Sequence, residues 1–183
     1  ISNQVLDTAK AVGVSVDEAT KLVGVFVKIG GLTAEEALNL TEATAQLARQ
    51  NGVAPVAALQ DIAASAEDVA AFTKDGGKNI AMAAIGAKKL GISMETVSKM
   101  SESLLSFEES INAQMEASML TGRMINTDKA RELALAGDLE GMQKEITSQI
   151  GSQADFEAMN SVQRKAMAAA FGVSVGELSK MVV

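Results

Sequence analysis

Hydrophobic residues recur along this chain at the spacing of an α-helix. The first clear run predicts a helix over residues 16–29 whose apolar face consists of Val16, Ala19, Leu22, Val23, Phe26 and Val27. A second run follows Pro55, which suits the first turn of a helix, and contains Val56, Leu59, Ile62, Ala66, Val69 and Phe72. Residues 74–77 then break the pattern, and the next helix is predicted over residues 78–90.

The longest predicted helix covers residues 94–120. Its apolar positions alternate steps of three and four, and the six that we predict to form a packing and assembly stripe are Val97, Met100, Leu104, Phe107, Ile111 and Met115. About 27 residues at ~1.5 Å each give a rod on the order of 40 Å. Such a rod needs a partner along its length, so its methionine-rich edge is either core or a surface for another helix.

A short joint recurs between the predicted helices: glycine, an apolar residue, then serine or threonine. It occurs at residues 13–15, 31–33, 91–93 and 172–174. The glycine suits the left-handed residue that ends a helix, and the hydroxyl two positions later suits the N-cap of the next helix. A glutamate three residues after the hydroxyl completes a capping box at three joints, where it is Glu18, Glu36 and Glu177.

These patterns predict an all-α fold, a multi-helix bundle or array of short helices with one long helix at 94–120. The only proline is Pro55, and no β-branched run with turn residues predicts a strand. We expect N-terminal helical hairpins over 1–93, and the long helix with shorter C-terminal helices over 94–183. The joints are separated by 18, 60 and 81 residues, too unequal for a fixed-period solenoid.

Composition argues against an enzyme. The chain has no histidine and no cysteine, so the usual neutral-pH base, the thiolate nucleophile and the commonest metal ligands are missing. Adjacent acids occur at 35–36, 67–68 and 108–109, but neighbours on a helix point about 100° apart, which does not suit a glycosidase pair. We interpret these acids as partners of helix dipoles and predict no catalytic residue, cofactor or metal site.

The net charge of the chain limits the classes of partner that we expect. The formal net charge is −7, and basic residues are not segregated, so a nucleic-acid surface is not expected. No uncharged run exceeds 11 residues, short of the roughly 20 that a membrane span needs. The chain begins with Ile1 and shows no secretory pattern, which we interpret as an excised part of a longer protein.

The second half carries a resemblance. The segments that carry it are 106–111 (SFEESI), 114–126 (QMEASMLTGRMIN), 130–146 (ARELALAGDLEGMQKEI), 156–166 (FEAMNSVQRKA) and the joint at 171–178 (FGVSVGEL), and they resemble segments of phage tail tape measure proteins. The resemblance covers about half the chain, and residues 1–93 are similar only in style. It implies a non-enzymatic, self-associating protein of the virion tail that is assembled in the host cytoplasm, occupies the tail tube and helps set tail length. The implied partners are the tail tube protein, the baseplate hub and tail assembly chaperones.

Two other interpretations remain open from the residues alone. A helical protein–protein interaction domain of a cellular protein would bind a partner helix in a groove. A wall hydrolase would need the paired acids to converge, and no aromatic sugar platform accompanies them.

Overall fold

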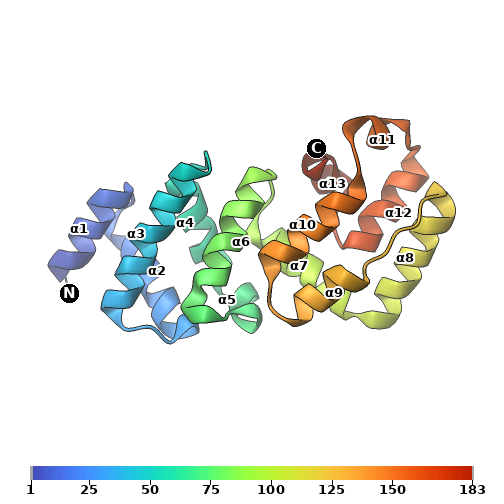
Figure 1. Cartoon of the computed structure of the whole chain (residues 1–183). Helices are drawn as coiled ribbons and strands as arrows, with labels where there is room; N and C mark the ends of the chain where they lie inside the picture. Colours follow the sequence, from blue (N-terminus) through green and yellow to red (C-terminus); the bar gives the residue numbers. More distant parts are fainter. Residues whose placement is uncertain (1, 183) are drawn as a thin grey trace. The chain divides into compact units, whose positions relative to one another are not determined.

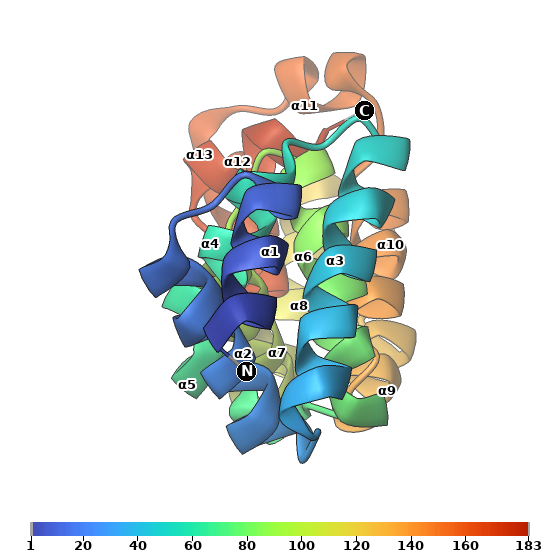
Figure 2. The ribbon, with the colours of Figure 1, turned by 90° about the vertical axis from the view of Figure 1, so that its left-hand side faces the viewer.

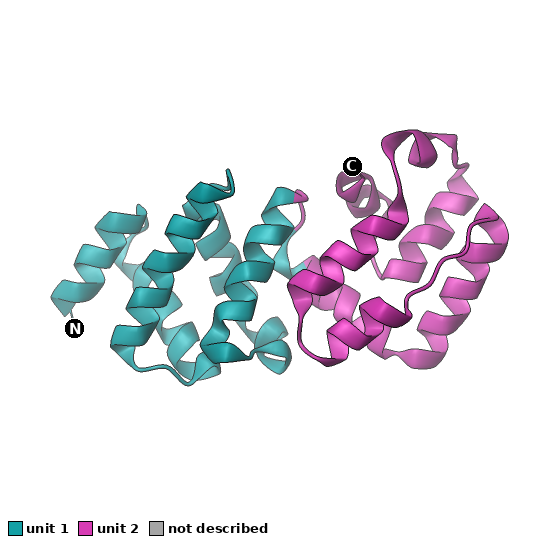
Figure 3. Cartoon of the chain, in the orientation of Figure 1, with its two compact units in different colours: residues 1–89, 93–95 teal, residues 90–92, 96–183 magenta. Residues whose placement is uncertain are grey.

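The computed structural model describes residues 2–182, and every regular element in that range is a helix (Figure 1). The predicted all-α class is confirmed. The chain divides into two compact units, residues 1–89 with 93–95 and residues 90–92 with 96–183 (Figure 3). It passes from unit 1 to unit 2 around residues 89–96, whereas the sequence-based division lies between 93 and 94.

Unit 1 is a bundle of short antiparallel helices around an aliphatic core. Its elements are α1 (Ser2–Val12), α2 (Val16–Gly30), α3 (Ala34–Gln50), α4 (Pro55–Ala64), α5 (Ala66–Val69), η1 (Ala70–Phe72), η2 (Asp75–Gly77) and α6 (Lys78–Lys89). Helices α1, α2 and α3 pack on one another, and α4 and α6 extend the bundle from α3 (Figures 1 and 2). The largest fully buried side chains of this unit are Leu22, Phe26, Leu59, Ile62 and Ile80.

Capping residues fix where two of these helices begin. The Ser15 hydroxyl accepts from the Glu18 N–H at 3.1 Å, and the Glu18 carboxylate accepts from the Ser15 N–H at 2.9 Å. Thr33 and Glu36 make the same reciprocal pair before α3. Gly31 has φ +66, the left-handed conformation that ends α2. These bonds satisfy N–H groups that lack partners within the helix.

Two details of unit 1 differ from the sequence-based prediction. Val16 and Val27 are exposed, because they lie at the margin of the α2 stripe whose centre buries Leu22 and Phe26. The run after Pro55 is also not one helix, since Ser65, with φ −105 and ψ 12, separates α4 from α5.

Unit 2 contains the helices that carry the predicted stripe. Its elements are α7 (Met94–Leu105, of which the first two residues belong to unit 1), α8 (Phe107–Thr121), α9 (Asp128–Leu135), α10 (Leu139–Ile150), α11 (Gln153–Ala158), α12 (Ser161–Phe171) and α13 (Val175–Met181). Helix α8 packs along α12, α9 packs on α10, and α13 contacts both α10 and α12 (Figure 1). The core includes Met100, Leu104, Leu139, Met142, Ile146 and Phe171.

The predicted single helix over 94–120 is wrong, because the chain turns at Ser106. This residue has φ −80 and ψ 77, outside the helical region. Its N–H still bonds the carbonyls of Glu102 and Ser103 at 3.1 and 3.2 Å, and its own carbonyl accepts from the Ser110 N–H at 2.9 Å. The break therefore leaves the backbone hydrogen bonds nearly intact. No glycine or proline occurs in this stretch, so tertiary packing and not a helix-breaking residue bends the chain.

Candidate assembly surface on helix α8

The structure divides the six predicted stripe residues into two groups. Val97, Met100 and Leu104, on α7, are completely buried in the core. Phe107, Ile111 and Met115, on α8, expose 51%, 44% and 57% of their surface. One sequence pattern thus supplies both core and surface, and only its second half is available to a partner.

The exposed half continues along α8 as a row of large apolar side chains. We use "α8 stripe" for Phe107, Ile111, Met115 and Met119, which follow one another every four residues. Met119 exposes 81% of its surface. Four residues on a helix return to nearly the same side, so the four side chains form one band that winds slowly around the helix. Isolated exposed apolar residues are common, whereas a row of four along one helix is a candidate interaction surface.

The buried face of α8 lies next to the α8 stripe around the helix and consists of small and polar side chains. Ser110 and Ala117 are buried, and Gln114 is half-buried between them. Helix α8 packs along α12, whose buried residues are Ala166, Met167, Ala168, Ala170 and Phe171. Small side chains let two helices approach closely, so α8 uses its small face for the fold and leaves its large apolar side chains outside.

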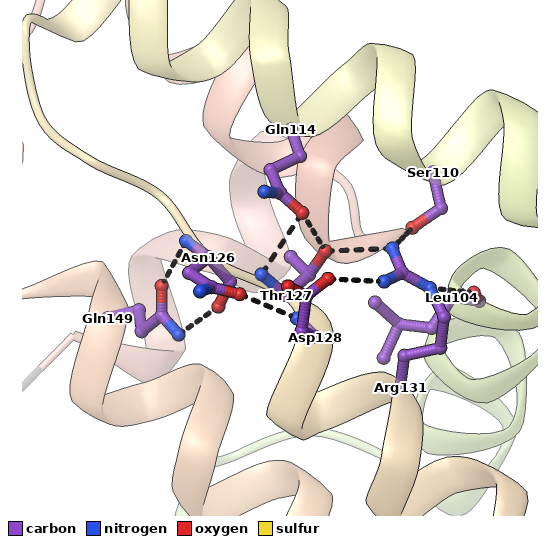
Figure 4. A network of polar contacts seen from close by, with 8 residues as sticks. All are labelled: Leu104, Ser110, Gln114, Asn126, Thr127, Asp128, Arg131 and Gln149. Atoms are coloured by element: carbon purple, nitrogen blue, oxygen red, sulfur yellow. Dashed lines mark hydrogen bonds and ion pairs between the residues drawn. The ribbon is translucent and has the colours of Figure 1, made fainter.

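A buried arginine holds the corner between α7 and α8 (Figure 4). Arg131, on α9, is only 7% exposed. Its Nε donates to the Leu104 carbonyl at 3.0 Å, and its Nη2 donates to the Ser110 and Thr127 hydroxyls at 2.9 and 3.0 Å. Its guanidinium carbon lies 5.9 Å from the centroid of the Phe107 ring, within cation–π range. One side chain therefore joins the end of α7, the start of α8 and the first residue of the α8 stripe.

The segment from α8 to α9, residues 122–127, is held as a strap across α8 and α10 (Figure 4). The Ile125 N–H donates to the Ser118 hydroxyl at 3.0 Å. The Thr127 hydroxyl donates to the side-chain amide oxygen of Gln114 at 2.5 Å. Asn126 exchanges hydrogen bonds with the Gln149 side-chain amide.

The start of the strap is fixed as well, and it presents one large apolar side chain. Arg123 donates to the carbonyls of Gln149 and Ile150 at 2.9 Å each, which caps the end of α10. The next residue, Met124, is 93% exposed. Hydrogen bonds of Arg123 and Ile125 hold the strap on both sides of Met124, so this exposed side chain stands on a fixed backbone.

The charged residues of helix α8 itself are all acidic. Glu108, Glu109 and Glu116 are exposed on α8, and residues 107–121 contain no lysine or arginine. Glu108 and Glu109 lie in the first turn, where the helix dipole favours a negative charge. The surface is an apolar band with an acidic edge.

The paired acids considered from sequence occupy first turns and not a cleft. Glu35 and Glu36 open α3, and Glu67 and Asp68 open α5. The Thr33 backbone N–H lowers the pKa of Glu36, which matches a capping role and keeps the carboxylate ionised. Among residues 2–182, no group of three or more acidic side chains is close enough to hold a metal ion. None of the helices in that range combines the length and apolarity required to cross a bilayer.

Comparison with known proteins does not add to this geometry. No family model, curated protein or solved structure matches the chain.

Proposed function

We propose that this chain is a structural module of a phage tail tape measure protein, and that it assembles with other copies through the α8 stripe without catalysing a reaction. The observation that carries the proposal is the α8 stripe, whose four large apolar residues are exposed while the small face of the same helix is buried. The resemblance of residues 106–111 and 114–126 to tape measure segments covers the same helix and its strap. In the virion the module would lie in the tail, with tube, hub and chaperone proteins as further partners.

The energetics favour association over a solvated surface. Burying a fully exposed large apolar side chain contributes about 1.5–3 kcal/mol, and the exposed part of each α8 stripe residue supplies a corresponding fraction of that to an interface. The Arg131 network and the strap hold this helix in place before any partner arrives. A preorganised surface loses less conformational entropy on binding.

Sedimentation equilibrium of the purified chain tests the assembly part of the proposal. We expect concentration-dependent oligomers, and we expect Ile111→Glu with Met115→Glu to leave a monomer with unchanged helix content. The matched control is Gln46→Glu with Gln50→Glu, which adds the same charge at exposed polar positions of α3. A wild-type chain that stays monomeric at all concentrations contradicts self-assembly and favours a helix-binding domain of a cellular protein.

The genes around the coding sequence test the virion part. We expect tube, chaperone and baseplate genes beside it. A metabolic neighbourhood would overturn the tape measure assignment even if the chain self-associates.

A further inference from the structure

Unit 1 exposes a face of helix α2 whose lysines are opposite in charge to the glutamates beside the α8 stripe. On α2, Lys21 and Lys28 are exposed on one side of Gly24, and Val16 and Val27 are exposed on the other side. No heavy atom lies within 4 Å of the position that a Gly24 side chain would occupy, so the centre of this face is open and low. We call these five residues the α2 face. Its two lysines form a basic edge and its two valines an apolar edge, and the exposed Asp17 and Thr20 lie with Gly24 between these edges.

The two surfaces match in size and in the spacing of their charges. Helices α2 and α8 each contain 15 residues. Lys21 and Lys28 are seven residues apart on α2, and Glu109 and Glu116 are seven residues apart on α8. Seven residues advance about 10.5 Å along a helix, so both charge pairs come into register together.

The order of the edges selects an antiparallel orientation. Successive residues of an α-helix are rotated by about 100°. When either helix is viewed from outside with its C-terminus upward, its charge pair therefore lies to the right of its apolar residues. Turning one helix over end to end keeps the charged edges on the same side, whereas a parallel pairing would set each charged edge against an apolar edge. In the antiparallel register Lys21 faces Glu116 and Lys28 faces Glu109.

The two acidic residues of α2 do not face the glutamates of α8 in this register. Asp17 lies at the N-terminal end of the α2 face and would stand opposite Leu120, away from Glu108 and Glu109. Glu18 is occupied within unit 1 by the Ser15 capping box and by the Gln60 amide, which donates to it at 2.5 Å. The α2 face therefore keeps its basic character where the α8 acids would meet it.

We infer that the α8 stripe of one copy docks antiparallel on the α2 face of a second copy, so that copies join head to tail. The inference rests on the proposed function, because it names the occupant of the same α8 surface. Pairing α8 with α8 would bring together two surfaces that carry only acids, and pairing α2 with α2 would bring lysines together. Like charges at an interface suppress the wrong partner, while the apolar residues supply most of the affinity.

A contact between two different surfaces of the same chain allows assemblies larger than a dimer. Each bound copy still presents one unused α2 face or α8 stripe, so growth continues until a ring closes or a filament forms. Assemblies larger than dimers are thus expected at high concentration.

Charge reversal tests the inference by sedimentation equilibrium, with circular dichroism to verify that each variant folds. We expect Lys21→Glu with Lys28→Glu to weaken association about tenfold or more, since two favourable pairs become two like-charge pairs. Lys78→Glu with Lys89→Glu is the matched control, with the same change of net charge at exposed positions of α6, and should remain close to wild type.

The reciprocal change completes the test. Glu109→Lys with Glu116→Lys should also weaken association, and an equimolar mixture of the two reversed chains should restore it. Folded reversed chains that fail to associate in the mixture would overturn the inference. The inference would also be overturned if the Lys21→Glu, Lys28→Glu chain associated as strongly as the wild type. If that chain associates but Ile111→Glu with Met115→Glu does not, the α8 stripe has another occupant and the proposed function stands.

Discussion

Helices α7 and α8 are consecutive in the chain, share one apolar register in sequence, and use it in opposite ways. In α7 the large residues Met100 and Leu104 are fully buried. In α8 the large residues Ile111 and Met115 are exposed, and the buried positions are the small residues Ser110 and Ala117. The difference teaches that an amphipathic pattern identifies the two faces of a helix without saying which one the fold will cover.

Anchoring contacts explain why α7 is committed to the core. Its first residue, Met94, donates a backbone hydrogen bond to Asp61 of α4 at 2.9 Å, and the Thr96 hydroxyl donates to Glu177 of α13 at 2.8 Å. At the other end of α7, Arg131 binds the Leu104 carbonyl. Beyond the turn at Ser106, α8 is held by its small face against α12, so the rotation of the helix leaves the stripe in solvent.

Shortening one apolar side chain on each side of the Ser106 turn should give the largest difference in the free energy of unfolding. Leu104→Ala removes a buried side chain and should lower the free energy of unfolding by about 2–5 kcal/mol, because it leaves a cavity. Ile111→Ala, on the exposed side, should change it by less than about 1 kcal/mol in the monomer. Urea unfolding at low protein concentration measures both. Equal losses would mean that α8 is also part of the core.

Removing the buried guanidinium should break the corner that separates the two helices. Arg131→Met should cost about 2–4 kcal/mol in urea unfolding, because the Leu104 carbonyl and two hydroxyls lose their donor. Arg131→Lys should recover little, since an ammonium group cannot reproduce the fork of donors. The ion pair to the exposed Asp128 contributes little, so Asp128→Asn is the control and should be nearly neutral.

Acid should weaken the anchor of α7. Burial raises the pKa of Glu177, but hydrogen bonds from the Ser174 N–H, the Thr96 hydroxyl and the Ser174 hydroxyl outweigh it, so the net pKa lies below the ordinary 4.5. A depressed folded-state pKa stabilises the protein above pH 4.5, and that contribution is lost as pH falls through the folded-state value. The Tm difference between wild type and Glu177→Gln should therefore shrink below pH 4.5. A difference that stays constant with pH would contradict this assignment.

Replacing the residue at the turn should have the smallest effect. Ser106→Ala removes a hydroxyl that bonds the Glu102 carbonyl at 3.2 Å and supplies a better helix former. Because Arg131 and the α12 contact set the corner, we expect a change of less than about 0.5 kcal/mol and two separate helices in the variant. A marked rise in helix content would show that Ser106 itself holds the turn.

Local chemistry was readable from the sequence at the glycine joints, where the partners are neighbours. Ser15 with Glu18 and Thr33 with Glu36 are three residues apart, so their reciprocal bonds depend only on the start of one helix. The strap was not readable, because Gln149 and Gln114 lie 23 and 13 residues from the strap residues that they bind. Arg131 gave no sequence signal either, since two of its acceptors, on α7 and α8, lie 27 and 21 residues away in the chain.

The sequence by itself determined that this protein is helical, because helical periodicity and N-capping act within a few residues of one another. It also marked the apolar positions from Val97 to Met115 as one set. Only the tertiary structure decided that Leu104 is core and Phe107 is surface. The physical reason is that burial depends on which face finds a closer-packing neighbour, and the small side chains of α8 fit α12 better than its large ones.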